Sequence, residues 1–160
     1  AMGGGALLDV GCYQVHAWAA LCPWLASSGG SVRITELVRD LGPTGVDLTT
    51  AARAQLGRGV DATMRSSFVE AASQSLRVDG TSTTVRMGSG EAFTSWRESS
   101  SLWVGDNEEH FTPVDAFSVM VEAMSERVHG GDAWVVPADQ SIAVAVMLDA
   151  LRATRPDVTA

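Results

Sequence analysis

The sequence predicts an α+β domain in which a mostly antiparallel, open sheet of about six strands has helices packed on one face. Three observations support this fold class. An apolar segment with helical spacing opens the chain, runs rich in Val, Thr and Ser fill the middle, and two further helical segments close it. Because helices and strands are segregated along the chain, an antiparallel sheet is favoured over alternating βαβ units.

Seven strands are candidates in the middle of the chain, and turn residues separate them. Hairpin turns are expected at 57–59 and 79–81, where Gly and Asp-Gly stand between β-type runs. The segment 106–110 is strongly polar and reads as a solvated loop. The predicted strands are 31–37, 48–56, 63–71, 75–78, 83–87, 92–98 and 101–104.

Three helices are predicted around these strands. The first covers about 6–20, where apolar residues recur every three or four positions, and Pro23 is expected to end it. The second covers 114–128, with Thr112 as its N-cap. The third starts near Pro137 and runs to about Thr154.

The composition of the chain limits its partners. It has 160 residues, of which 46% are hydrophobic, and a net charge of -8. This charge opposes binding to nucleic acid or to an anionic membrane surface. The longest apolar stretch, 6–26, is interrupted by charged and polar residues, and no signal peptide opens the chain. We therefore expect a soluble, cytoplasmic protein with neither of these partners.

The reactive residue types are few. All eleven cationic residues are arginines, so no lysine amine is available in this chain for proton transfer or a Schiff base. Cys12 and Cys22 are too few for a disulfide framework and lack metal-ligand spacing. We expect no metal site and no cofactor-binding residues here.

The first helix carries the candidate site residues. Asp9 and Tyr13 are four apart and share one face of a helix, and His16 lies about one turn further. A phenol can transfer a proton when a neighbour tunes it, and histidine titrates near neutral pH. A structural reading stays open, in which Asp9 caps the helix, Tyr13 is a core aromatic and His16 is a core histidine with its hydrogen bonds satisfied.

Several motifs then occur in a characteristic order. The segment 3–16 has Asp, Gly and Tyr at set positions after three glycines, and Gly45-Val46-Asp47 leads into a predicted strand. A strand and turn at 76–81, the Gly130-Gly131 pair and the run 136–139 follow. Together they resemble the C-terminal domain of the glucose–fructose oxidoreductase / inositol dehydrogenase / MocA (Gfo/Idh/MocA) family.

This resemblance has consequences for fold and domains. It implies a domain like the C-terminal domain of dihydrodipicolinate reductase, with residues 1–155 as one substrate-binding and dimerisation domain and 156–160 as a flexible tail. The Rossmann domain of the family would be absent. A homodimer through the open sheet face, a sugar-like substrate and a Rossmann domain in the parent protein are the partners it implies.

The resemblance also assigns roles to residues. Tyr13 falls at the family's proton-transferring His or Tyr, and Asp9 matches its acidic residue, so the pair would be catalytic. His16 falls where most members carry an Asp or Asn that contacts substrate hydroxyls, which makes His16 a substrate-binding candidate. In such enzymes a hydride passes between NAD(P) and a sugar or polyol carbon.

The chain alone lacks parts of that machinery. The family's catalytic lysine belongs to the Rossmann half, and no glycine-rich dinucleotide loop follows a strand here. We therefore expect the substrate-side part of an oxidoreductase that is incomplete alone. The alternatives are a standalone, non-catalytic assembly or ligand-binding module and, less favoured, a small cofactor-independent enzyme.

Overall fold

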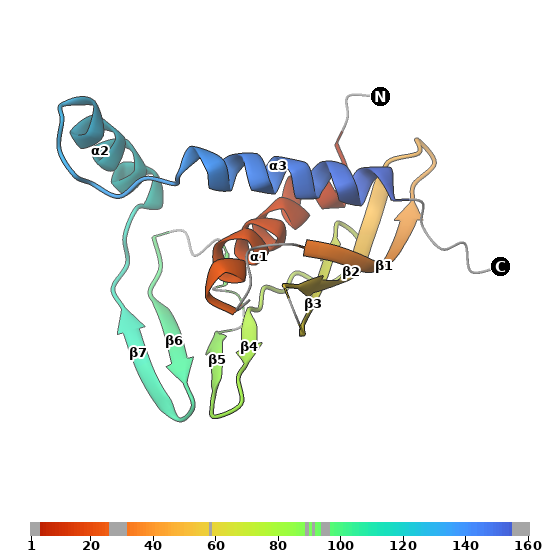
Figure 1. Cartoon of the computed structure of the whole chain (residues 1–160), viewed down its shortest axis with the longest axis horizontal. Helices are drawn as coiled ribbons and strands as arrows, with labels where there is room; N and C mark the ends of the chain where they lie inside the picture. Colours follow the sequence, from red (N-terminus) through yellow and green to blue (C-terminus); the bar gives the residue numbers. More distant parts are fainter. Residues whose placement is uncertain are drawn as a thin grey trace. The chain divides into compact units, whose positions relative to one another are not determined.

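The computed structural model describes residues 4–25, 32–57, 59–88, 90, 92–93 and 97–154, and the chain divides into two compact units (Figure 1). Residues 1–70 and 136–160 form the first unit, and residues 71–135 form the second. The first unit contains a π-helical turn (Leu7–Gly11), α1 (Cys12–Leu25), β1 (Val32–Leu41), β2 (Asp47–Leu56), β3 (Val60–Ser67) and α3 (Ala138–Ala153). The second contains β4 (Arg77–Asp79), β5 (Thr84–Met87), β6 (Ser100–Val104), β7 (Asn107–Phe111) and α2 (Ala116–Val128).

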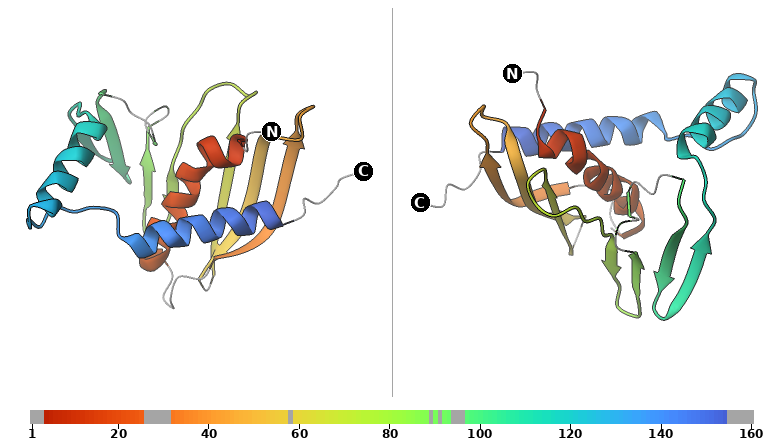
Figure 2. Two further views of the ribbon diagram at one scale, coloured as in Figure 1. Left: turned by 90° about the horizontal axis from the view of Figure 1, so that it is seen from above. Right: turned by 180° about the vertical axis from the view of Figure 1, so that it is seen from behind.

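The first unit is a three-stranded antiparallel sheet with the order β1-β2-β3. Side chains of β2 alternate, so that Ala52, Ala54 and Leu56 are buried while Arg53 is exposed. Helices α1 and α3 lie over the buried face, as Figure 2 shows. The core between the layers consists of Leu7, Val15, Trp18, Cys22, Leu37, Ala52, Ala54, Leu56, Met64 and Leu151.

The opposite face of this sheet is polar. Arg53 pairs with Glu36 across β1 and β2, with 3.0 Å between Nε and Oε2, and Arg65 on β3 pairs with Glu70. Such exposed pairs contribute little to stability, but they satisfy the long side chains of a solvated face. The sheet therefore has one apolar and one polar face, as expected for an antiparallel sheet covered on one side.

The second unit contains a four-stranded antiparallel meander with the order β4-β5-β6-β7. The guanidinium of Arg86 lies 4.4 Å from the ring centroid of Trp103 on the neighbouring strand, a cation–π contact. Helix α2 begins after Asp115, whose carboxylate accepts the backbone N–H groups of Phe117 and Ser118. Arg97 donates to the same carboxylate, and these bonds hold the pKa of Asp115 below its usual value.

The predicted α+β class with antiparallel strands is confirmed, but the strands divide between two sheets. One local cause is visible at the end of β3. There the Ser67 hydroxyl accepts the N–H groups of Val69 and Glu70, so the chain turns away instead of extending the strand.

Several boundary predictions were wrong. The predicted strand 92–98 is not a strand at its described positions, 92–93 and 97–98. Residues predicted as a solvated loop instead form the exposed strand β7, paired with β6. Asp115, not Thr112, caps α2. Helix α1 continues past Pro23 to Leu25, although a proline inside a helix removes one backbone hydrogen bond.

The three predicted helices and both hairpins are present, with Arg58 and the predicted tail 156–160 outside the described residues. Among the described helices, none combines the length and the apolar character that a membrane crossing needs.

Both cysteines are free and shielded. Burial raises the pKa of the Cys22 thiol, and burial, reinforced by the nearby Asp9 charge, raises that of Cys12 against the opposing effect of the Tyr13 backbone N–H. We expect iodoacetamide to label both thiols slowly at pH 8, because less thiolate is present, and quickly in urea. Mass spectrometry of the two peptides measures this, and fast labelling of Cys22 in the folded chain would contradict it.

Candidate active site

Asp9 and Tyr13 stand at the start of the first helix, and both are exposed. Asp9 lies in the π turn, and Tyr13, with 45% of its surface accessible, lies in the first α-helical turn after it. A π turn rotates less per residue than an α turn, so four residues across this junction complete nearly one full turn. The acid and the phenol therefore lie on one side of the helix, open to solvent. The reading of Tyr13 as a core aromatic is wrong.

His16 points in another direction. It is half-buried, and the side-chain amide of Gln140, at the start of α3, donates to its Nε2 over 3.2 Å. An acceptor Nε2 requires the proton of a neutral ring to sit on Nδ1. His16 therefore joins α1 to α3 through this bond.

The helix start depends on a residue far along the chain. The backbone N–H of Leu7 donates to Oδ2 of Asp47 over 2.7 Å, and the hydroxyl of Thr50 donates to the same oxygen over 2.8 Å. Ala6, the residue before the π turn, makes no side-chain cap of its own. A carboxylate on the first turn complements the positive helix end. Asp47 thus caps the helix that carries Asp9 and Tyr13.

Comparison with known proteins first gives a negative result, since no family model and no curated protein matches the sequence. Solved structures do match. The 3-ketoreductase KijD10 from Actinomadura kijaniata, in complex with TDP-benzene and NADP, superposes with a TM-score of 0.72 at 23% identity, over 94% of this chain and 47% of that one.

Two further matches are more distant in sequence. The aldose-aldose oxidoreductase from Caulobacter crescentus, complexed with glycerol, gives a TM-score of 0.69 at 18% identity, over 93% of this chain and 44% of that one. The dehydrogenase MviM from Clostridium difficile gives a TM-score of 0.66 at 8% identity, over 92% of this chain and 47% of that one. All three belong to the Gfo/Idh/MocA family.

The chain has the Gfo/Idh/MocA C-terminal domain fold. It spans about half the length of the solved structures that it matches. The resemblance inferred from the sequence motifs is confirmed at the level of the fold, and the Gly45-Val46-Asp47 motif gains a physical meaning. In this Gfo/Idh/MocA fold Asp47 comes to the helix that follows the glycine run, although the two motifs are 40 residues apart in sequence.

Two polar residues near the candidate site were missed by the sequence reasoning. Gln14 follows Tyr13, and its amide donates to the Arg65 carbonyl on the edge strand β3 over 2.7 Å. Gln140 binds His16 from α3. No signal in the sequence links Gln140 to the first helix, because the two residues that meet are 124 positions apart.

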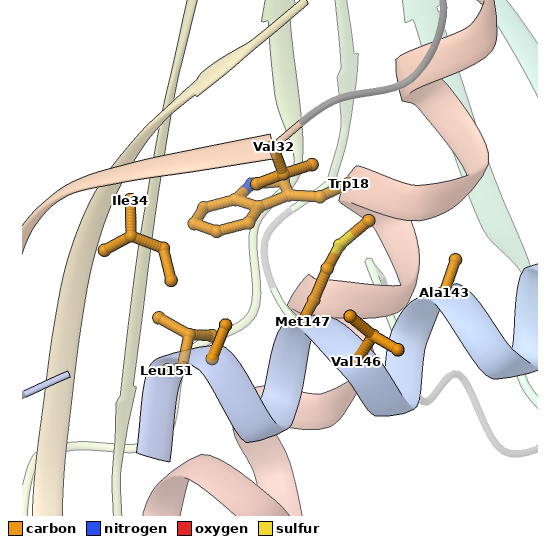
Figure 3. Close-up of a pocket in the computed structure, with 8 residues that line it drawn as sticks. Trp18, Val32, Ile34, Ala143, Val146, Met147 and Leu151 are labelled. Carbon is orange, nitrogen blue, oxygen red and sulfur yellow. The ribbon is translucent and has the colours of Figure 1, made fainter. Parts of the chain in front are cut away.

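The structure also has an apolar pocket, which does not include Asp9 or Tyr13. It lies between α1, β1 and α3, has a volume of about 190 Å³, and Figure 3 shows the Trp18 ring, Ile34 and Met147 around it. Its wall consists of Trp18, Val32, Ile34, Ala143, Val146, Met147, Ala150 and Leu151. None of these side chains can transfer a proton at neutral pH. Among the described residues there is also no group of three His, Cys, Asp or Glu arranged to hold a metal ion.

Proposed function

We propose that this chain is the substrate-side part of an NAD(P)-dependent oxidoreductase that acts on a sugar- or polyol-like hydroxyl or carbonyl. The observation that carries the proposal is the helix start, where an acid and a phenol stand side by side and open to solvent on a fold shared with oxidoreductases. The neighbours named as an aldose-aldose oxidoreductase and a 3-ketoreductase with bound NADP support the substrate and cofactor classes.

In this proposal Tyr13 moves the proton of the reacting hydroxyl. The exposed phenol donates to a developing alkoxide during reduction and accepts the proton back during oxidation. The Asp9 carboxylate orients the phenol. His16 donates from Nδ1 to a second substrate oxygen, since its Nε2 already accepts from Gln140. A nicotinamide held by a nucleotide-binding Rossmann part of the protein would supply the hydride for reduction and accept it in oxidation.

The start of the first helix does not fit NAD(P) phosphates. A helix N-terminus attracts phosphate through free N–H groups and its positive end. Here the Leu7 N–H is already bound by the Asp47 carboxylate, which puts a negative charge where a phosphate would approach. We expect no NADPH binding by this chain at micromolar concentration in a fluorescence titration. Micromolar affinity would contradict this assignment of the cofactor to another part.

The function is tested by assaying this chain joined to, or mixed with, the nucleotide-binding part of its own protein. NAD(P)H oxidation in the presence of keto-sugars or nucleotide-linked keto-sugars is the expected result. Failure of the assembled protein to oxidise NAD(P)H or reduce NAD(P)+ with any sugar or polyol would overturn the proposal.

A second candidate is a non-catalytic assembly module, favoured by one observation on α2. Apolar residues spaced three or four apart form an exposed stripe along this helix, and none of its described residues is buried. Such a stripe usually marks a contact. The stripe, which would meet a second copy of the chain in this alternative, consists of Phe117, Met120, Val121, Met124 and Val128.

We also propose that the chain forms a homodimer through the polar, helix-free face of β1–β3. Light scattering at micromolar concentration should give twice the 16.8 kDa chain mass, and high salt should weaken the dimer because the face is charged. Arg53→Glu should lower the mass, whereas Met124→Glu should not. A monomer would remove the proposal, and the reverse pattern would favour the α2 alternative.

A cytoplasmic location is proposed as well. Cys12 and Cys22 are both free, which suits a reducing compartment.

A further inference from the structure

The carboxylate of Asp47 lies very close to Gly5, just before the first helix. A Cβ atom built on Gly5 would be 1.9 Å from Oδ1 and 2.7 Å from Cγ of Asp47, so any side chain at position 5 would displace this carboxylate. Only a glycine allows the contact. The glycine before the helix and the aspartate at the start of β2 are therefore one structural unit.

The carboxylate is also fixed from its own side. The β1–β2 turn is closed by backbone bonds from Gly42 N to Val46 O and from Gly45 N to Gly42 O, at 2.8 and 2.9 Å. Thr50, which is fully buried, donates its hydroxyl to Oδ2. Asp47 therefore has little freedom, and the position of its Oδ2 determines where the Leu7 N–H must lie.

The turn that Asp47 holds is the one that places the site residues. The π turn begins at Leu7, Asp9 is its third residue, and Tyr13 follows within one turn of α-helix. Single π turns are uncommon and persist where their surroundings support them. If the Leu7 N–H lost its partner, an ordinary α-helical start would rotate Asp9 relative to Tyr13.

We propose that Asp47 is a positioning residue, which fixes the π turn and thereby the angle between Asp9 and Tyr13 around the helix axis. This inference rests on the proposed function only for its catalytic consequence. The geometric part concerns the free chain and stands or falls by itself.

The chain offers a direct probe of this geometry, since Tyr13 is its only tyrosine. Incorporating 3-fluorotyrosine gives one fluorine NMR signal, which reports on the Tyr13 ring alone. We expect Asp47→Ala to shift or broaden this signal. Asp47→Asn should leave it near the wild-type position, because an amide oxygen still accepts from Leu7 N. The control Asp61→Ala, an exposed carboxylate on β3, should also leave it unchanged.

The inference can still be tested if the Asp47→Ala variant does not fold. If Asp47→Ala is unfolded by circular dichroism, Gly5→Ala replaces it, since the added Cβ would displace the Asp47 carboxylate from the helix start. A shift of the tyrosine signal in Gly5→Ala supports the inference. An unmoved signal in a folded Asp47→Ala, or in Gly5→Ala when Asp47→Ala does not fold, overturns it.

The catalytic consequence is measured in the protein assembled with its nucleotide-binding part. Because small displacements of reacting groups are costly, Asp47→Ala should lower kcat by roughly 10- to 100-fold with KM changed less than about twofold. Asp47→Asn should restore most of the rate. A KM effect alone would overturn the positioning role. Absence of any activity in the unaltered protein would instead sink the proposed function, and the fluorine signal would still decide the geometry.

Discussion

Replacing Tyr13 with Phe should lower kcat of the assembled oxidoreductase by about 10²- to 10⁴-fold, the usual contribution of a positioned proton-transfer group. The substitution removes one oxygen atom from an exposed ring and leaves the helix otherwise intact. KM should change little, because the phenol acts on the proton that moves in the transition state. Steady-state NAD(P)H oxidation measures both constants.

Two comparisons separate chemistry from folding in this experiment. The free energy of unfolding of Tyr13→Phe should equal that of the wild type within about 0.5 kcal/mol, as for other exposed positions. Asp9→Asn should lower kcat less, since Asp9 only orients the phenol in this account. An unchanged kcat in Tyr13→Phe would show that another group moves the proton.

The shared helix face of Asp9 and Tyr13 could be predicted because it depends on local spacing, whereas its exposure to solvent could not. Asp9 and Tyr13 are four residues apart, and helical periodicity brings such residues together whatever surrounds them. The role of His16 could not be read in this way. Its direction is set by Gln140 on α3, and a single sequence carries no signal of that long-range bond.

The division of the strands between two sheets could not be predicted from the sequence for a related reason. Side-chain alternation predicts that a segment is a strand but not which strand accepts its hydrogen bonds. Strand β7 lacks even this signal, because all five of its residues are exposed and four of them are polar. Its pairing with β6 follows from the adjacent tight turn at Gly105 and Asp106, which the polar composition concealed.

Asp47 illustrates what a motif can and cannot tell. Gly45-Val46-Asp47 is one pattern in the sequence, and the glycine run before the helix is another. The contact between them depends on the absence of a Cβ at Gly5, which a sequence shows, and on the path of β2, which it does not. The physical link between the motifs became visible only when the sheet placed them together.

Truncating Leu151 to Ala should lower the free energy of unfolding by about 2–5 kcal/mol, the range for a leucine removed from a core. Leu151 is the one described residue of α3 that is buried, at 0% exposure, and it joins the core of the β1–β3 sheet. The apolar pocket beside it would enlarge because Leu151 is part of its wall. Urea unfolding followed by circular dichroism measures the loss.

Val146→Ala on the same helix provides the matched control. Its side chain also lines the pocket but is 61% exposed, so its loss should cost no more than about 0.5 kcal/mol. The comparison isolates burial, because both changes remove aliphatic carbons from α3 and leave alanine behind. If Leu151→Ala were as mild as Val146→Ala, α3 would not be packed on the sheet. The hydrogen bond between Gln140 and His16 could then not form, because it requires α3 to lie beside α1.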